Sequence, residues 1–364
     1  MFYYLLVFFA TSLISVGLLL LKKPFFSLAK ATAALLNTLL DSSMDELAKQ
    51  KILIQKLGKL LSTLGAFVLA IILIIGISFV PIMLYLQFQS KTIEDLDITS
   101  FKFYGSMIMA SVIFFIFPMK KEKKDYSDWS ILLHQMVLDN YIFSKSIFGL
   151  EKKLFKSKAK KQKERFVVVS GLARAGTTAL TDLLFRSGKF HSLSYANMPF
   201  LLGVNIWKKF YKPRMNKLKQ RAHGDKVMFG YKTIEALEEY FFKVFLRDKF
   251  ITDNTLVEHE IDDETYENYM IYQNLVNFNG DASTYLAKNN NLILRYKSLR
   301  KHNPFFKVVL IFRRPVEHAY SLFNQHIRFS KLQEEDPFVK EYMTWLGHHE
   351  FGLYFSRIDL TASK

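Results

Sequence analysis

The sequence predicts an α/β domain with a P-loop-like, mostly parallel sheet flanked by helices, preceded by an N-terminal transmembrane helical region. Three observations lead to this fold class. Long apolar segments without charge are confined to residues 1–119. From residue 165 onward, short apolar runs typical of buried strands alternate with helical patterns. The first of these runs, at 166–169, leads into a glycine-bounded loop and then a helix, which is how a phosphate cradle is built.

Three segments of the N-terminal region contain no charged side chain: residues 1–21, 61–88 and 103–119. A membrane-spanning helix needs about 20 apolar residues, so we expect a transmembrane helix at each position. The third segment is short, and a buried hairpin is its alternative interpretation. A signal peptide is the alternative for residues 1–21, but a basic start is missing, and Lys22 and Lys23 follow this segment rather than precede it.

The distribution of lysines between these segments predicts the orientation in the membrane. Residues 22–59 carry seven lysines against three acidic residues, whereas residues 91–102 carry two lysines against three acidic residues. The positive-inside rule then places the first connection, and everything after residue 120, in the cytoplasm, with the N-terminus outside. The chain has no cysteine, which suits a soluble domain in a reducing compartment.

Residues 120–164 are expected to connect the membrane region to the soluble domain. An amphipathic helix is predicted at 125–143, with an apolar face formed by Trp129, Leu132, Leu133, Met136 and Val137. Residues 145–165 then hold nine basic side chains against Glu151 and Glu164. A solvated linker is one interpretation of this segment. Attraction to anionic lipid headgroups, worth about 1 kcal/mol per basic residue near the surface, is the other.

Strands and helices are predicted to alternate along residues 165–364. Strands are expected at 166–169, 291–295 and 307–312, and helices at 177–186, 233–247, 264–277, 316–329 and 336–346. An open sheet of this kind binds its ligand at the carboxyl ends of its strands. The final residues, SRIDLTASK, are predicted to form a short polar tail.

The most informative stretch is RFVVVSGLARAGTTALTDLLFR, at residues 165–186. Gly171 and Gly176 bracket a turn in which backbone N–H groups can converge on an anion, and the following helix directs its positive end at the same place. The spacing G-x-x-x-x-G-T-T is similar to a nucleotide-triphosphate loop. However, Thr177 replaces the lysine that reaches the β- and γ-phosphates, and a cation stands earlier, at Arg174. The sequence therefore predicts an anion other than a hydrolysable triphosphate.

A second anion-binding motif is predicted at residues 307–321, KVVLIFRRPVEHAYS. Here an apolar strand ends in Arg313, and Ser321 follows on a new helix. A guanidinium group offers two parallel donors to phosphate oxygens, and a hydroxyl near a helix start adds a third. Two anion sites at two strand ends fit a nucleotide with two separate phosphate groups.

With both motifs in this order, residues 165–355 resemble the sulfotransferases that use 3′-phosphoadenosine 5′-phosphosulfate (PAPS). The first motif is similar to their 5′-phosphosulfate loop, a strand followed by G-x-x-[KR]-[SA]-G-T-T and a helix, and the second to their 3′-phosphate site. A bacterial, membrane-anchored branch of the family is resembled most, through the stretches SLSYANMPFLL, RAHGD, EALEEYFF, KNNNLILR and QHIRFSKLQEEDPFVKEYMTWLGHHEFG.

The resemblance implies PAPS as the sulfate donor, no metal, and transfer to a hydroxyl of an envelope glycan or lipid-linked acceptor. Arg313 and Ser321 would hold the 3′-phosphate, and Arg174 would also stabilise charge on the bridging oxygen. The 5′-phosphate would be held by Gly171, Arg174, Ala175, Gly176, Thr177 and Thr178. Because PAPS is made in the cytoplasm, the expected location is a bacterial inner (plasma) membrane, with membrane lipids as partners. Nucleic acid is not expected despite the net charge of +17, since much of the excess flanks the apolar segments and no recognition motif is present.

The general base is left open by the sequence. His223 in RAHGD, with Asp225 to orient it, is preferred because an imidazole titrates near neutral pH; Glu235, Glu238 and Glu239 are the alternatives. Lys288 is either a contact to a sulfate oxygen or a solvated lysine beside a strand. His348, His349 and Glu350 are not expected to bind a metal, because adjacent positions on a helix diverge by about 100°.

Two other functions remain as alternatives. A membrane-tethered nucleotide kinase or NTPase would use the same strand, loop and helix, but it should show the loop lysine and an aspartate for Mg²⁺. A non-catalytic membrane scaffold is the other alternative. This alternative is favoured by a departure from the family pattern. Sulfotransferases usually continue with a glycine-containing loop that closes over the donor, and this loop is expected to be lacking here.

Overall fold

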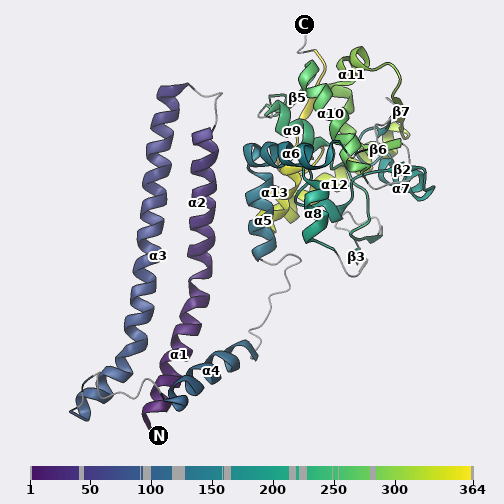
Figure 1. The fold of residues 1–364 in the computed structure, drawn as a ribbon. Coiled ribbons are helices and arrows are strands. Elements are labelled where there is room, and N and C mark those ends of the chain that lie inside the picture. Colours follow the sequence, from purple (N-terminus) through teal and green to yellow (C-terminus); the bar gives the residue numbers. More distant parts are fainter. Residues whose placement is uncertain are drawn as a thin grey trace. The chain divides into compact units, whose positions relative to one another are not determined.

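The computed structural model describes most of the chain as two compact units, Met1–Leu132 and Leu133–Lys364. Each unit is described by itself (Figure 1). The described residues are 2–40, 45–90, 92, 100–116, 128–157, 159, 165–212, 219–220, 228–247, 249–252, 254–278 and 284–361.

The N-terminal unit is helical. It contains α1 (Phe2–Leu20), α2 (Lys22–Leu40), α3 (Glu46–Phe88) and α4 (Phe101–Ile116). Helical hydrogen bonds continue across Leu21, so α1 and α2 form one rod, and α3 runs antiparallel to it (Figure 1). Residues 22–59 were predicted to connect two membrane spans. The structure instead places most of them in α2 and in the first turns of α3. A Cβ atom at Gly17 would lie 2.4 Å from Cγ2 of Ile74, so glycine allows α1 to approach α3 closely.

Helix α3 has the length and composition of a membrane-spanning helix. Its charged residues lie within Glu46–Lys59, and the most apolar part has a mean hydropathy of 3.0 with most of its side chains exposed. Among the described residues it is the one helix long and apolar enough to cross a membrane, and it contains the predicted span at 61–88. The predicted span at 1–21 forms the shorter helix α1, and the predicted span at 103–119 overlaps α4, with 117–119 outside the described residues. The multi-pass topology and the orientation stay predictions.

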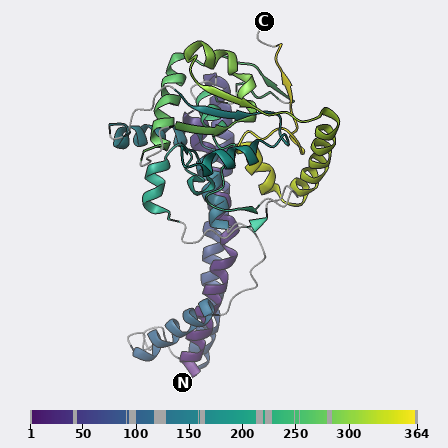
Figure 2. The same cartoon turned by 90° about the vertical axis from the view of Figure 1, so that its right-hand side faces the viewer.

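The C-terminal unit is built on a β-sheet that is seen in Figure 2. The sheet has four parallel strands in the order β2-β6-β1-β7. These strands are β1 (Val167–Ser170), β2 (Phe190–His191), β6 (Thr284–Lys288) and β7 (Lys307–Leu310). The predicted α/β fold class with a parallel sheet flanked by helices is thereby confirmed. Since all four strands run the same way, their carboxyl ends share one edge of the sheet.

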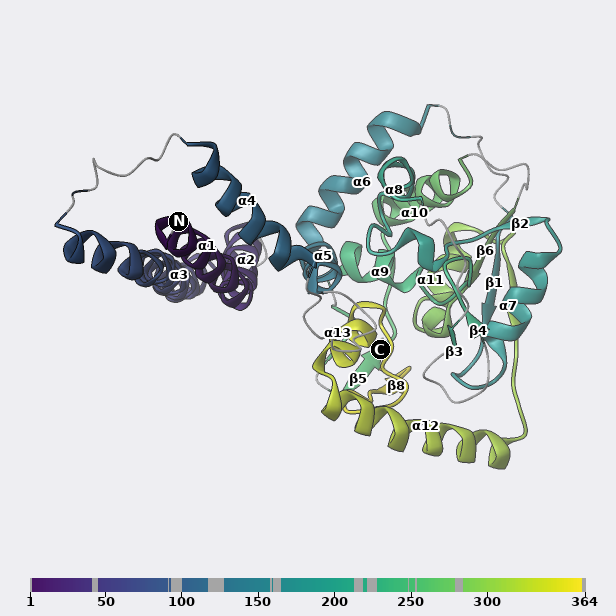
Figure 3. The same ribbon diagram turned by 90° about the horizontal axis from the view of Figure 1, so that it is seen from below.

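Helices cover both faces of this sheet (Figure 3). One face presents the register partners Val168, Ala287 and Val308, which pack in a single apolar core with α6 (Tyr141–Phe155), α9 (Glu239–Leu246) and α10 (Asp263–Val276). Helix α7 (Thr177–Arg186) lies on the other side. The core is rich in aromatic rings: Phe166 stacks on Phe306 with ring centroids 4.9 Å apart.

The remaining described elements complete the unit around this core. Its helices are α8 (Val204–Phe210), α11 (Tyr296–His302), α12 (Pro315–Glu335) and α13 (Pro337–Trp345), together with the second half of α5 (Asp128–Leu138), which begins in the N-terminal unit. Two short pairs of strands are also present, the antiparallel β3 (Lys219–Gln220) and β4 (Met228–Phe229), and the parallel β5 (Thr255–Val257) and β8 (Arg357–Asp359). The final residues were predicted to be a polar tail; this was wrong for Arg357–Asp359, which pair with β5.

The predicted strand at 291–295 was also wrong. Residues Asn290–Leu294 form a 3-10 helix, and the strand of this region is β6, which ends at Lys288. The Asn289 side chain accepts a hydrogen bond from the backbone N–H of Asn291, which starts a helical turn and ends the strand. Apolar residues of the turn, such as Leu292 and Leu294, are buried without being in a sheet.

The connector contains more ordered structure than was predicted. In place of one helix at 125–143 there are two, α5 and α6, and Asn140 between them accepts a hydrogen bond from the N–H of Phe143. Residues 145–155 are not a solvated linker, because Phe148 and Phe155 are buried in the core of the C-terminal unit. Glu151 is buried too, and its carboxylate accepts hydrogen bonds from the N–H groups of Asn205 and Ile206 at the start of α8.

Candidate active site

A glycine-bounded loop joins β1 to α7 at the carboxyl edge of the sheet. Gly171 has a φ of 149°, and a Cβ atom there would lie 2.3 Å from the carbonyl oxygen of Ile311. The N–H of Ile311 donates to the carbonyl of Ser170 at 2.9 Å. The chain leaving β1 therefore touches the chain leaving β7, and this position accepts only glycine without displacement of the backbone.

The second half of the loop prepares the N-terminus of α7 for an anion. Gly176, with a φ of 107°, precedes the helix, and no side chain in the described part of the protein caps its first N–H groups. Arg174 has a φ of 69°, unusual for a residue with a side chain. Thr177 is buried and Thr178 is half-buried in the first turn. Uncapped N–H groups at the positive end of a helix favour phosphate or sulfate groups.

The two motifs predicted from the sequence meet at this edge. Nε of Arg174 donates to the hydroxyl of Ser321 on α12 at 3.3 Å, and a terminal nitrogen of Arg313 donates to the carbonyl oxygen of Arg174 at 3.3 Å. Arg313 is exposed and Arg174 and Ser321 are half-buried, so these groups border on solvent. Two cations and a hydroxyl from distant parts of the chain therefore lie together beside the loop.

His318 is a residue of this edge that the sequence analysis missed. It lies on α12 between Arg313 and Ser321, is buried, and has Nε2 2.7 Å from the carbonyl oxygen of Ala173. This contact fixes α12 to the glycine-bounded loop and so fixes Ser321 relative to Arg174. The sequence feature that could have identified His318 is its position inside the second motif, in PVEHAYS.

Lys288 lies at the carboxyl end of β6, beside β1, with Val169 as its register partner. Its ammonium group is 2.5 Å from the carboxylate of Glu235, and both side chains are 7% exposed, so the interpretation as a solvated lysine was wrong. Asn290, two residues further on, accepts a hydrogen bond from the hydroxyl of Thr177 at 3.5 Å. The end of β6 is therefore a third side of the anion site.

The four residues considered as general base are either outside the described residues or engaged in buried contacts. His223 and Asp225 lie outside the described residues. Glu235 is paired with Lys288, and Glu238 accepts hydrogen bonds from Tyr269 at 2.7 Å and from Asn289 at 3.1 Å. Glu239 forms two hydrogen bonds, 2.6 and 2.7 Å, with Arg295. All three glutamates are buried in such contacts, and burial raises the pKa of Glu238.

Arg295 holds a buried polar cluster under the site. Its side chain is 0% exposed and that of Glu239 is 2% exposed. The guanidinium lies over the rings of Phe242 and Phe250, and its Nε donates to Nε2 of His259 at 3.1 Å. Burial and the Arg295 charge lower the pKa of His259 to about 4, which keeps the ring neutral so that Nε2 can accept this hydrogen bond.

The neutral state of His259 predicts an acid-sensitive fold. The unfolded chain takes up a proton on this ring below about pH 6.5, whereas the folded protein resists protonation down to about pH 4. The contribution of neutral His259 to the free energy of unfolding is at most about 3 kcal/mol. It is fully present above pH 6.5 and is lost as the pH falls toward 4. We expect the midpoint of thermal unfolding to fall over this range, and to fall less in His259→Gln, whose amide oxygen can still accept from Arg295. Identical profiles for the two proteins would exclude His259 as the cause.

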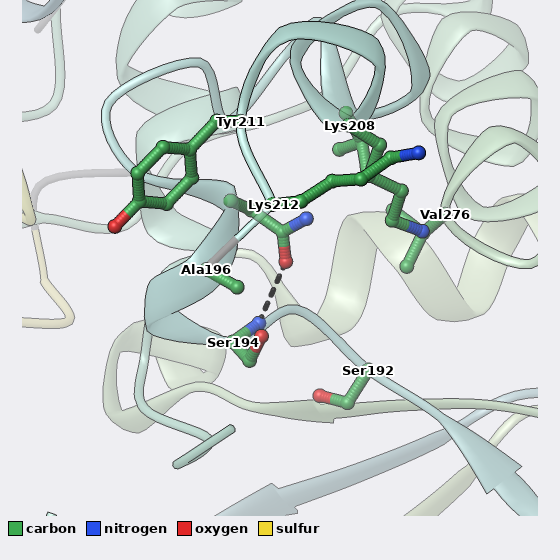
Figure 4. A pocket seen from close by; sticks show the side chains of 9 residues that line it. Ser192, Ser194, Ala196, Lys208, Tyr211, Lys212 and Val276 are labelled. Carbon is green, nitrogen blue, oxygen red and sulfur yellow. Dashed lines mark hydrogen bonds between the residues drawn. The ribbon is translucent and has the colours of Figure 1, made fainter. Parts of the chain in front are cut away.

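A pocket of about 400 Å³ opens near the carboxyl end of β2 (Figure 4). Ser192 and Ser194, just after β2, provide hydroxyls, and the side chains of Lys208 and Lys212 extend across from them. The pocket is completed by Ala196, Asn197, Val204, Tyr211 and Val276. Since β2 is parallel to β6 and β1, this pocket lies toward the same sheet edge as the anion site.

Aromatic rings support the wall of the pocket. Tyr211 stacks on Trp207, with ring centroids 5.0 Å apart, and Trp207 stacks on Phe200 at 4.7 Å. Hydroxyls, amines and an aromatic ring in a space of this size suit a ligand with many oxygens, such as a sugar. The sequence analysis did not identify this pocket. The feature that could have indicated it is the mixture of aromatic and basic residues in NIWKKFYK.

The fold and the two strand-end loops define an α/β protein with a candidate anion-binding site at the carboxyl edge of its sheet. In the described part of the chain, no group of three or more His, Cys, Asp or Glu side chains is placed to hold a metal ion.

Comparison with known proteins adds two solved structures. No family model and no curated protein matches the chain. Sulfotransferase STF1 from Mycobacterium tuberculosis H37Rv is similar at 15% identity and a TM-score of 0.35, over 54% of this chain and 63% of that one. Sulfotransferase STF9 from Mycobacterium avium is similar at 13% identity and a TM-score of 0.32, over 70% of this chain and 72% of that one.

Proposed function

We propose that this protein is a membrane-anchored sulfotransferase that moves a sulfuryl group from PAPS to a hydroxyl of an envelope glycan or lipid-linked acceptor. One observation carries the proposal: Arg174 in the β1–α7 loop contacts both Arg313 and Ser321, which follow β7. Two anion-binding loops in contact at one sheet edge suit a nucleotide that carries phosphate at its 3′ position and phosphosulfate at its 5′ position.

The residues in the first loop favour phosphosulfate over a triphosphate. Thr177 stands where a nucleotide-triphosphate loop has its lysine, and Arg174 supplies the positive charge from another point in the turn. Gly171 and Gly176 would let the backbone approach the 5′-phosphate, and Ala175, Thr177 and Thr178 would add N–H and hydroxyl donors. Arg313 and Ser321 would take the 3′-phosphate.

The reaction needs stabilisation of the leaving group. The acceptor oxygen attacks sulfur in line, and the bond between sulfur and the bridging oxygen breaks, so that negative charge develops on the 5′-phosphate. Arg174, the N-terminus of α7 and the hydroxyls of Thr177 and Thr178 would stabilise this charge from fixed positions. Fixed donors that need no rearrangement during the reaction are the most effective form of such stabilisation.

The acceptor would enter through the pocket formed by Ser192, Ser194, Lys208, Lys212 and their neighbours. Its hydroxyls and amines suit a sugar, and anchoring by helices of the N-terminal unit suits an acceptor that is attached to lipid or assembled at the membrane surface. We place the catalytic unit on the cytoplasmic side of a bacterial inner membrane, where the lysine-rich segment 22–59 would contact anionic lipids.

Calorimetry on the full-length protein in detergent tests the donor. We expect adenosine 3′,5′-bisphosphate, the product left after sulfate transfer, to bind at least about tenfold more tightly than ATP with Mg²⁺, because only the former places anions at both loops. A preference for ATP with Mg²⁺ would favour the kinase or NTPase alternative. Absence of binding by either nucleotide would favour a non-catalytic scaffold.

A further inference from the structure

The segment Gly347–Glu350, after α13, brings an imidazole and a carboxylate together near the anion site. Nδ1 of His348 lies 3.3 Å from Oε2 of Glu350, and their side chains are 21% and 16% exposed. With Nδ1 facing the carboxylate, Nε2 is the ring nitrogen left to take a proton from another group. An imidazole oriented by a carboxylate is a frequent arrangement for general-base work.

Hydrogen bonds connect this pair to the glycine-bounded loop. Oε1 of Glu350 accepts from the side-chain amide of Asn290 at 3.0 Å, and the amide oxygen of Asn290 accepts from the hydroxyl of Thr177 at 3.5 Å. One side chain, that of Asn290, therefore separates Glu350 from the first residue of α7. The amide of Asn291 also donates to the carbonyl of Gly347 at 3.1 Å, which holds the segment against the end of β6.

The surroundings keep Glu350 ionised. Burial raises the pKa of this carboxyl, but hydrogen bonds from His348 and Asn290, and the positive charge that His348 carries whenever it is protonated, outweigh burial and lower the pKa to about 2. Two other titratable groups lie close by: His349, whose pKa is lowered by burial and by Lys243, and Lys243 itself, which donates to the carbonyl of Thr344. Glu239 on α9 faces Gly347 and is bound to Arg295.

The glutamates near the anion site are less suited to accept the proton. Glu235, Glu238 and Glu239 are each bound to a buried partner, so protonation of any of them would weaken an existing contact. His318 is similarly engaged with the carbonyl of Ala173. Within the described residues, the side chain of His348 contacts Glu350 through Nδ1, so Nε2 can face an acceptor hydroxyl.

We infer that His348 is the general base of the transfer reaction and that Glu350 is its positioning residue, an inference that rests on the proposed sulfotransferase function. As the acceptor oxygen attacks sulfur, its proton passes to Nε2 of His348. The bond between sulfur and the bridging oxygen breaks, and its electron pair stays on the 5′-phosphate of the nucleotide. The products are the sulfate ester, adenosine 3′,5′-bisphosphate and a protonated His348. Asn290, which is hydrogen-bonded to both Thr177 and Glu350, keeps the base at a fixed position relative to the loop that holds the leaving group.

The test measures transfer from ³⁵S-labelled PAPS by the full-length protein, with membranes from cells that lack the protein as the acceptor. His348→Gln should lower the rate about 10²- to 10⁴-fold, the usual contribution of a general base. Its binding of adenosine 3′,5′-bisphosphate, measured by calorimetry, should stay within about twofold of wild type, which also shows that the variant folds.

The pH profile separates proton transfer from a structural role. In wild type the rate should fall on the acid side as the base becomes protonated, and this limb should be absent from the residual activity of His348→Gln. Glu350→Gln should keep the limb but move it to lower pH, because the protonated ring loses its negative partner. A merely structural carboxylate would not shift the profile in this way.

His302→Gln is the matched control, since His302 lies on α11, contacts the carbonyl of Ile261 and is separate from the site. It should keep the wild-type rate and pH profile. Wild-type rate and profile in His348→Gln would overturn the inference, as would loss of the acid limb in His223→Gln instead. A wild-type protein that binds no nucleotide would overturn the proposed function as well, so the two failures are distinguishable.

Discussion

Arg313→Ala is expected to weaken binding of adenosine 3′,5′-bisphosphate by roughly 30- to 150-fold. The substitution removes a guanidinium that would donate to the 3′-phosphate, and hydrogen bonds to charged groups contribute about 2–3 kcal/mol. It also removes the hydrogen bond from Arg313 to the carbonyl oxygen of Arg174, so the two loops lose one of their contacts. Calorimetry with the full-length protein measures the change directly.

The neighbouring residue offers a matched control. Arg314 has the same charge and is exposed, but its guanidinium faces Glu317 at 3.5 Å. Arg314→Ala should therefore change the affinity by no more than about threefold, because exposed charges act weakly through water. Equal losses in both variants would mean that general positive charge, rather than a 3′-phosphate site at Arg313, attracts the nucleotide.

The second large effect is expected on stability. Arg295→Leu should reduce the free energy of unfolding by about 3–5 kcal/mol, because it leaves the Glu239 carboxylate buried without its partner. For a unit of this size the loss corresponds to a fall of about 6–20 °C in the unfolding midpoint. Thermal unfolding of the full-length protein in detergent, followed by intrinsic fluorescence, provides the measurement.

Lys301→Leu removes a pair with equally good geometry but a different environment. Lys301 and Glu260 lie 2.5 Å apart, yet both are mostly exposed. Exposed pairs contribute little to stability because water screens them, so this variant should unfold within about 4 °C of wild type. If Arg295→Leu were as mild as Lys301→Leu, the buried pair could not be a major support of the site.

The parts of the fold that could be predicted from the sequence are those with strong local signals. The run Phe166–Val169, the glycines of the following loop and the helix from Thr177 are encoded within one short stretch, and the structure places β1 and α7 there. The second motif is equally local, since an apolar run ends before Arg313 and Pro315 starts a helix. The expectation that both motifs share one sheet edge then follows from parallel strands.

The parts that could not be predicted depend on contacts between distant segments. Lys288 was assigned the wrong place because the apolar run Leu292–Leu294 has the composition of a strand, and only tertiary packing makes it a helical turn. Residues 145–155 carry many lysines, so their burial through Phe148, Glu151 and Phe155 is not visible in the charge pattern. The approach of Glu350 to Asn290, 60 residues away, has no signature in the sequence at all.

The contact between Gly171 and Ile311 bears on how a ligand would be selected. The two loops leave neighbouring strands and are bonded to each other before any nucleotide arrives, so little conformational freedom is left for binding to remove. A rigid edge of this kind would bind molecules whose two anionic groups lie one fixed distance apart. It would discriminate against molecules in which this distance is longer or shorter. Discrimination among adenine nucleotides would then be a property of the backbone scaffold, present from the moment the sheet forms.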